Sequence, residues 1–292
     1  MDDELLMGLA DCGSPEKLLT VILKHHPDWA PPVPVEELAA AVNVVELREL
    51  ETDAFEGALL TDPEKRKGAI LYKAGARCAR RRFTIAHELG HFLMPSHKGD
   101  EHCTANDLRE MRLDEGHRRR EAEANRFAAG LLMPRPWFSR DMDKLGDADV
   151  THVQTLADRY CTSLEATSNR YIDLTDDVCA FVFSKDGVIR YIRSTKTFPR
   201  LAVRAGNPLP AGCSSLKAPT ELLRVATPWV EIDGSVWLQT DRRQGTPTVL
   251  EQTMRQSNGF QVSLLFVEAK HFDDQEEEAE LSESWEVGFK RR

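Results

Sequence analysis

The segment HELGH at residues 87–91 constrains this chain more than any other part of its sequence. Its surroundings predict an α-helix, because no proline interrupts the segment until Pro95 and the apolar residues recur with helical spacing. On a helix, His87 and His91 lie one turn apart on one face, where two imidazole rings can bind a single metal ion. The carboxylate of Glu88 then lies beside that ion. The motif therefore predicts a helix that carries two metal ligands and a general base.

This arrangement is typical of zinc-dependent peptide hydrolysis. A catalytic zinc ion takes three protein ligands and keeps one position for water. Zinc makes that water nucleophilic at neutral pH, and Glu88 would accept its proton during attack on a peptide carbonyl. Zinc is therefore the expected cofactor, although these ligand types would also accept Mn2+ or another divalent ion. The alternative is an ordinary buried helix whose two histidines are hydrogen bonded within the core.

The third metal ligand has several candidates. His97 follows the second histidine of the motif at the spacing of HExxHxxGxxH peptidases, but that pattern has a glycine where this chain has Met94. A second helix is predicted at residues 118–132, and its Glu121 is the preferred ligand. Glu121 and Glu123 lie roughly 200° apart around the helix, so only one of them can face the metal. Glu123 ranks second as a ligand and His97 third. The alternative for both glutamates is an exposed helix surface.

Small residues support the choice of Glu121. They accompany it on its own face of the second helix and also lie beside the histidines of the first: Ala86, Gly90, Ala124 and Ala128. Such residues would let the two helices pack closely. Asn125, one turn after Glu121, is a candidate for orienting a metal-bound histidine through a hydrogen bond.

The two motifs together resemble a known family. HELGH, followed by EAEANRFAAGLLMP at residues 121–134, is similar to the ImmA/IrrE family of bacterial zinc metallo-endopeptidases. The segments PVPVEELAAAVNVVEL, FEGALLTDPEKRKGAILY and LADRYCTSLEATSNRYIDL extend the resemblance over roughly residues 33–175. The resemblance implies that His87, His91 and Glu121 are the metal ligands. It also implies that the substrate is a repressor with a helix-turn-helix domain, whose cleavage switches on stress-response or mobile-element genes.

A predicted strand before the HELGH helix is a candidate for substrate binding. The segment containing Ala69, Ile70, Leu71 and Tyr72 is bounded by turn residues and reads as a strand. If it lies at the edge of a sheet, an extended peptide could bind to it through main-chain hydrogen bonds. The alternative is an ordinary strand inside the sheet.

A helical pair is predicted at residues 151–174. Its turn, around a Cys-Thr-Ser sequence, resembles that of a helix-turn-helix, and a DNA-reading role would place Ser168, Asn169 or Arg170 against the bases. The preferred interpretation is an αα-hairpin packed on the rest of the protein, because the basic residues expected of a DNA reader are few here.

Composition limits the location and partners of the protein. The chain of 292 residues is 41% hydrophobic and 29% charged, as expected for a globular protein of one or two domains. It has neither an apolar run long enough to span a membrane nor the start of a secretory signal. The six cysteines contain no CxxC pair, so a cytoplasmic location is expected. The net charge of −10 disfavours nonspecific DNA binding.

We expect an α+β fold in several parts. These are an N-terminal helical extension (1–32), a zincin-like peptidase domain of helices with a small sheet that includes the helical pair (33–175), a β-rich domain of unknown role (176–272) and an acidic tail (273–292). The β-rich part should contain a hairpin at residues 180–192 and another around Asp233 and Gly234.

The preferred hypothesis is a cytoplasmic zinc endopeptidase that cleaves a protein partner. Two alternatives belong to other classes of protein. One is a metal-stabilised module, of an antitoxin-like kind, that binds its partner without cutting it. The other is a DNA-binding regulator that uses residues 151–174. Glu88 favours the peptidase, because a purely structural metal site needs no general base.

Overall fold

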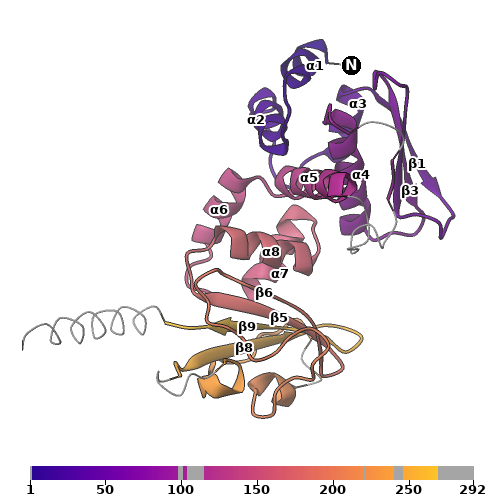
Figure 1. Ribbon diagram of the computed structural model, residues 1–292. Helices are drawn as coiled ribbons and strands as arrows, with labels where there is room; N and C mark the ends of the chain where they lie inside the picture. The colour runs from indigo at the N-terminus through magenta and orange to yellow at the C-terminus, as the bar shows by residue number, and fades with distance from the viewer. Residues whose placement is uncertain are drawn as a thin grey trace, which may run out of the picture. The chain divides into compact units, whose positions relative to one another are not determined.

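The computed structural model describes residues 2–97, 101–103, 115–219, 221, 223–239 and 246–268. These residues form helices and two β-sheets, which confirms the predicted α+β class (Figure 1). The chain divides into two compact units. The first comprises Met1–Lys144 and Thr155–Arg170, and the second comprises Leu145–Gln154 and Tyr171–Arg292. The acidic tail expected at 273–292 lies outside the described residues, and the other expected domain limits stay predictions.

Three short helices open the first unit: α1 (Asp3–Ala10), α2 (Pro15–His25) and α3 (Val35–Ala41). The helix α2 begins where a proline follows a capping serine, and the Ser14 hydroxyl accepts a hydrogen bond from the backbone N–H of Lys17. Asp2 caps α1 in the same way and also lies 2.7 Å from Nε2 of His25, so its carboxylate joins α1 to α2.

A four-stranded sheet in the order β1-β3-β2-β4 belongs to the same unit. Its strands are β1 (Val44–Leu50), β2 (Gly57–Thr61), β3 (Gly68–Lys73) and β4 (Glu101–Cys103). Because β3 pairs in parallel with β1 and antiparallel with β2, the edge strand expected at Ala69, Ile70, Leu71 and Tyr72 is wrong. The backbone groups of these residues already serve two neighbouring strands. Among the described residues, the sheet ends at β1 and β4.

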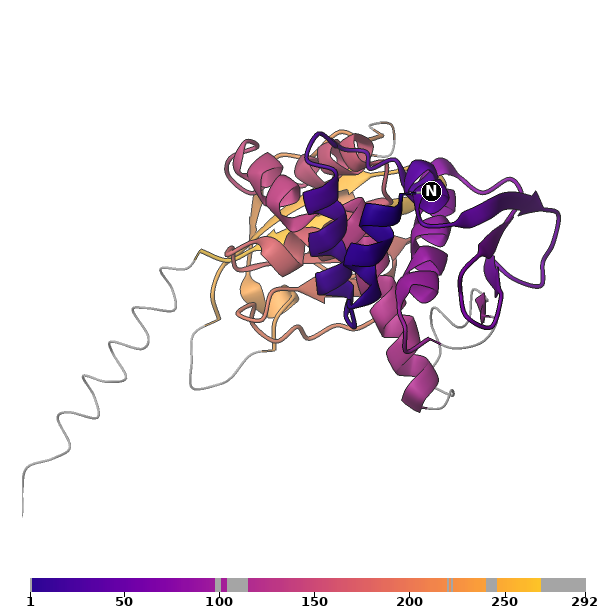
Figure 2. The same cartoon turned by 90° about the horizontal axis from the view of Figure 1, so that it is seen from above.

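Two long helices contain the two sequence motifs: α4 (Cys78–Leu93) holds HELGH, and α5 (Glu115–Leu132) holds Glu121. They pack against each other, and α4 also packs on β2 and β3 (Figure 1 and Figure 2). A Cβ atom added at Gly90 would lie 3.2 Å from Cα of Ala124 and 3.1 Å from Cδ1 of Phe127. The expected close packing of small residues between the two helices is therefore present.

The remaining helices are α6 (Arg135–Asp143), α7 (Thr151–Tyr160) and α8 (Leu164–Leu174), of which α7 and α8 form the predicted pair. Within α8, Ser168 is fully buried, and Nε of Arg170 donates a hydrogen bond to the carbonyl oxygen of Met133 at 3.0 Å. Two of the three side chains that DNA reading would need are thus engaged within the protein. This favours the interpretation as a packed αα-hairpin.

A buried carboxylate ties α6 to α7 and gives a stability prediction. Oδ2 of Asp141 accepts hydrogen bonds from the Tyr160 hydroxyl at 2.9 Å and from Nε of Arg159 at 2.6 Å. Asp141→Asn is expected to destabilise the protein at pH 7 by about 1–3 kcal/mol, because the buried Tyr160 hydroxyl and the guanidinium lose a charged acceptor. Urea unfolding measures this difference, and Asp143→Asn, at an exposed position of the same helix, is the control.

The same contact should depend on pH in a defined direction. Burial raises the pKa of Asp141, but the hydrogen bonds from Tyr160 and Arg159 outweigh burial and hold that pKa below its ordinary value. The stabilisation is therefore complete above the unfolded pKa of about 3.9 and is lost as the pH falls through the lower folded pKa. A wild-type advantage over Asp141→Asn that stayed constant down to low pH would contradict this assignment.

The second unit contains a five-stranded antiparallel sheet in the order β6-β5-β9-β8-β7. Its strands are β5 (Cys179–Lys185), β6 (Val188–Ser194), β7 (Val230–Ile232), β8 (Val249–Arg255) and β9 (Phe260–Phe266). The strands β5 and β6 form the first expected hairpin. The second expected hairpin is wrong: residues Gly234–Val236 form a short 3-10 helix, and β7 pairs with β8. The Asp233 side chain accepts a hydrogen bond from the N–H of Ser235, which starts that helical turn.

One buried acid stands out in the second unit. Glu251 is fully buried and accepts hydrogen bonds from the backbone N–H groups of Ser214 and Ser215 and from the indole of Trp237, at 2.8–3.0 Å. These contacts account for its burial as a structural residue. No helix among the described residues has the length and apolar character needed to cross a membrane.

Candidate metal centre

The helix α4 holds the HELGH motif as the sequence predicts. It ends at Leu93, two residues before Pro95, and its residues from Thr84 to Phe92 are buried. Nζ of Lys65 donates hydrogen bonds to the carbonyl oxygens of His91 at 2.6 Å and Met94 at 3.2 Å. Because the last carbonyls of a helix lack partners within it, this lysine stabilises the end of α4 that carries the second histidine.

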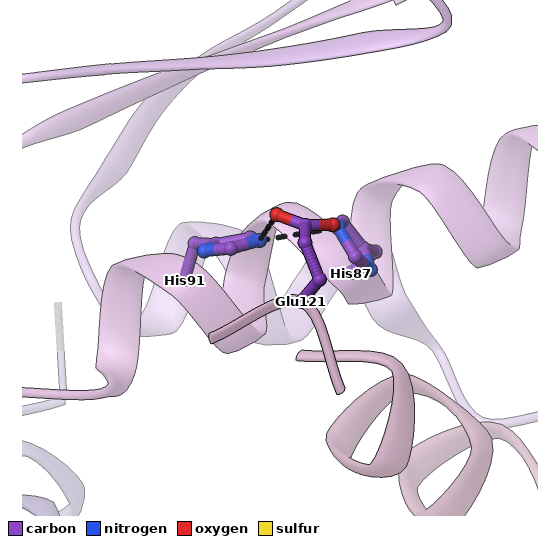
Figure 3. A group of neighbouring side chains, drawn as sticks. All are labelled: His87, His91 and Glu121. Atoms are coloured by element: carbon purple, nitrogen blue, oxygen red, sulfur yellow. Dashed lines mark hydrogen bonds and ion pairs between the residues drawn. The ribbon is translucent and has the colours of Figure 1, made fainter. Parts of the chain in front are cut away.

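Three side chains converge between α4 and α5. His87, His91 and Glu121 point toward one another, and all three are at least 96% buried (Figure 3). The Nε2 atoms of the two histidines lie 3.1 Å apart. Oε2 of Glu121 lies 3.3 Å from Nε2 of His87, and its Oε1 lies 3.2 Å from Nε2 of His91. The structure thus brings together the three residues that the sequence ranks first as metal ligands.

The spacing of these atoms fits a metal ion. Two ligands that each lie about 2.0 Å from a tetrahedral zinc ion are about 3.3 Å apart, which matches the three distances of this cluster. Two imidazoles and one carboxylate are also the donor set of catalytic zinc sites that leave a position for water. Among the described residues, this is the group of histidine, cysteine and acidic side chains arranged to hold an ion.

The pKa values of His91 and Glu121 favour the protonation states in which these side chains bind a metal ion. Burial lowers the pKa of His91 to about 4, against the opposing effect of its hydrogen bond to Glu121, so its imidazole is neutral at pH 7. Burial raises the pKa of Glu121, but the hydrogen bonds to His87 and His91 outweigh burial and hold that pKa below its ordinary value. A neutral imidazole and an ionised carboxylate are the protonation states that bind metal ions.

Asn125, the candidate for orienting a metal-bound histidine, contacts His87. Oδ1 of Asn125 lies 3.1 Å from Nδ1 of His87, on the side of the ring away from Glu121. A hydrogen bond from Nδ1–H to this amide oxygen leaves Nε2 free to bind a metal ion. His117, on the first turns of α5, lies farther out, with its Nε2 atom 3.9 Å from Oε1 of Glu121.

The two lower-ranked ligand candidates lie behind His91. Nδ1 of His97 is 3.1 Å from Nδ1 of His91, and Nε2 of His97 is 3.0 Å from Oε2 of Glu123. Nε of Arg119 in turn donates a hydrogen bond to Oε1 of Glu123 at 2.9 Å. His97 therefore contacts the Nδ1 side of the His91 ring and Glu123 contacts His97, while Glu121 contacts the Nε2 side of His91. The sequence does not predict this contact of Arg119, because its (i, i+4) spacing from Glu123 is that of an ordinary ion pair on a helix surface.

Glu88 is fully buried on α4, which packs against β2. Gly57, the first residue of β2, lies so close that a Cβ atom there would be 2.6 Å from Oε1 of Glu88 and 2.5 Å from Cγ2 of Thr84. This glycine lets the strand approach the carboxylate. A glycine within a strand pattern is a general signal of such close approach, and it is the signal by which the sequence could have revealed Gly57.

This contact makes Gly57→Ala a sensitive test of the strand position. The added methyl group is expected to displace the Glu88 carboxylate and to cost about 1–3 kcal/mol of stability by overpacking. Thermal unfolding of the purified protein measures the loss. Gly13→Ala is the matched control, because a Cβ atom at Gly13 meets nothing within 4 Å. Equal stability of the two variants would show that β2 does not lie against Glu88.

The fold and the site together define an α+β domain with a buried set of His, His and Glu ligands. Residues 43–171 match the sequence model of the IrrE N-terminal-like domain, the peptidase family M78. The matched residues contain α4, α5 and all the residues of the cluster. No curated protein matches the chain.

Among solved structures, a Mycobacterium tuberculosis transcriptional regulator is similar to this chain. The two share 12% identity with a TM-score of 0.49, over 91% of this chain and 74% of the regulator.

Proposed function

We propose that this protein is a metal-dependent endopeptidase and that its metal is a zinc ion held by His87, His91 and Glu121. The observation that carries the proposal is the convergence of two imidazole nitrogens and one carboxylate, next to Glu88 on the same helix. The match of residues 43–171 to a peptidase family supports the same assignment.

The roles of the side chains follow from their positions. His87, His91 and Glu121 would hold a zinc ion, which would supply Lewis acidity toward a peptide carbonyl and a water molecule. Glu88 accepts a proton from that water on a carboxylate oxygen and returns it to the leaving amine nitrogen. Asn125 holds the ring of His87 through Nδ1, and His97 holds the ring of His91 in the same way. Both rings are thereby fixed with Nε2 toward the site.

For the substrate, we propose a protein partner, namely a helix-turn-helix transcriptional repressor in the cytoplasm. Cleavage of the repressor would switch on stress-response or mobile-element genes. The resemblance of both motifs to the ImmA/IrrE family supports this proposal. Direct DNA binding is not part of it, because the net charge is −10 and Ser168 in the helical pair is buried.

An extended substrate could add to the sheet at β4. In the described part of the sheet β4 is an edge strand, and it pairs with β2 where Gly57 stands opposite Cys103. Because Gly57 also contacts Glu88, a peptide bound along this edge would lie on the side of the sheet nearest the proposed general base.

The test is co-expression with the helix-turn-helix repressor encoded nearest to the gene, followed by gel analysis and mass measurement of the repressor. We expect a truncated repressor with the wild-type protein, and an intact one with Glu88→Gln or after a chelator has removed the metal. An intact repressor that co-purifies with the wild-type protein would instead identify a binding module that does not cut. Cleavage by Glu88→Gln at the wild-type rate would contradict the role of Glu88 as general base.

A further inference from the structure

Two cysteines that are far apart in the sequence meet in the first unit. Sγ of Cys78 lies 3.0 Å from Sγ of Cys161, although 83 positions separate them in the chain. Cys78 is the first residue of α4 and is exposed, whereas Cys161 directly follows α7 and is half-buried. The separation of the sulfur atoms is about 1 Å longer than a disulfide bond, so a small side-chain movement would join them.

The backbone at Cys161 adds a second observation. Cys161 has a φ of 51°, in the left-handed region that glycine or asparagine usually occupies at the end of a helix. A cysteine at this position costs more conformational energy than glycine would, and its thiol points at Cys78. The other cysteines whose surroundings are described, Cys12, Cys179 and Cys213, are buried.

We propose that Cys78 and Cys161 are a redox-active pair that forms a reversible disulfide with a peroxide as oxidant. Cys78 is the exposed thiol, so it meets the oxidant first. Burial raises the pKa of the Cys161 thiol, which disfavours its thiolate and leaves the first attack on the peroxide to Cys78. This proposal concerns a site outside the metal cluster and does not depend on peptidase activity.

The reaction balances with hydrogen peroxide. The Cys78 thiol loses its proton and its sulfur attacks one peroxide oxygen, so that the O–O bond breaks, a sulfenic acid forms and the other oxygen leaves as water. The Cys161 sulfur then attacks the sulfenic sulfur, the S–O bond breaks, and the hydroxyl leaves as water with the Cys161 proton. Two thiols are oxidised to one disulfide, and the peroxide is reduced to two water molecules. Two equivalents of a small thiol reverse the change.

The position of the pair gives the disulfide a structural consequence. It would join the N-terminal end of α4 to the turn between α7 and α8. The closed loop would contain His87, Glu88, His91 and Glu121. Because a crosslink over a long loop restricts the unfolded chain, oxidation should raise the Tm of the first unit by roughly 10 °C.

The test treats the purified full chain with hydrogen peroxide, alkylates the remaining thiols after unfolding, and maps the peptides without reductant. We expect a crosslinked peptide pair containing Cys78 and Cys161, an increase in Tm, and reversal of both by dithiothreitol. Cys78→Ser should abolish the crosslink. Cys161→Gly should abolish it too, and should fold well because glycine accepts the left-handed backbone at that position. Cys12→Ser, the matched control, should keep the crosslink.

Several outcomes would overturn the proposal. One is alkylation of both thiols after peroxide treatment. Another is oxidation of Cys78 to a sulfinic acid without a crosslink. A third is a crosslink to another cysteine or to a second chain. The folded state of each variant is checked by its circular dichroism spectrum, so loss of the crosslink in an unfolded protein is not mistaken for support.

Discussion

Replacing Glu88 by glutamine is expected to reduce the rate of peptide-bond hydrolysis by about 10²–10⁴-fold, the usual contribution of a positioned general base. The reason is chemical rather than structural. The amide cannot accept the proton of the attacking water, while its size and shape match those of the carboxylate. Fully buried Glu88 lies beside Gly57 and Thr84, where an isosteric side chain disturbs the packing least.

The measurement is kcat/KM for repressor cleavage, together with the zinc content of each protein. We expect the rate to collapse in Glu88→Gln while one zinc ion per chain remains bound. Glu123→Gln, assayed at saturating zinc, is the matched control, because it removes another buried carboxylate charge that contacts His97 and not Nε2 of His87 or His91. A Glu88→Gln protein that had lost its zinc would place Glu88 among the ligands instead of beside them.

The second large effect concerns Glu121. Glu121→Gln is expected to weaken zinc binding by more than about 100-fold, because the neutral amide replaces the one charged ligand of the set and the loss should exceed that from any outer partner. Glu123→Gln should weaken zinc binding by roughly 10-fold to 100-fold, because Glu123 acts on the metal only through His97 and His91. Competition with a chromophoric zinc chelator measures both.

The relative loss of zinc affinity in the two variants shows whether Glu121 or Glu123 is the metal ligand. They stand two positions apart on α5 and are both buried, so the same substitution is made in closely similar surroundings. A larger loss in Glu123→Gln would make Glu123 the ligand and Glu121 the supporting residue. Unfolding curves of the zinc-free proteins show whether either change harms the fold by itself.

Much of the candidate site could be inferred from the sequence, because its geometry is that of helices. The spacing of His87 and His91 on α4 follows from hydrogen bonds between residues four apart, which are local. The same periodicity placed Glu121 and Asn125 on one face of α5, and Gly90 and Ala124 indicated where the helices approach. Local rules also set the start of α2 and the hairpin of β5 and β6.

Local sequence patterns were therefore enough to predict the helix of the HELGH motif, its two histidines and the face of α5 that contacts them. The position of β3 inside its sheet became known only from the fold, because strand periodicity does not reveal how many neighbours a strand has. The contact of His97 with His91, the contact of Glu123 with His97 and the approach of Gly57 to Glu88 also became known only from the tertiary structure. The contact between Cys78 and Cys161 likewise could not be predicted from the sequence. These contacts join residues far apart in the chain, and they arise from packing between elements, which no local pattern of residues encodes.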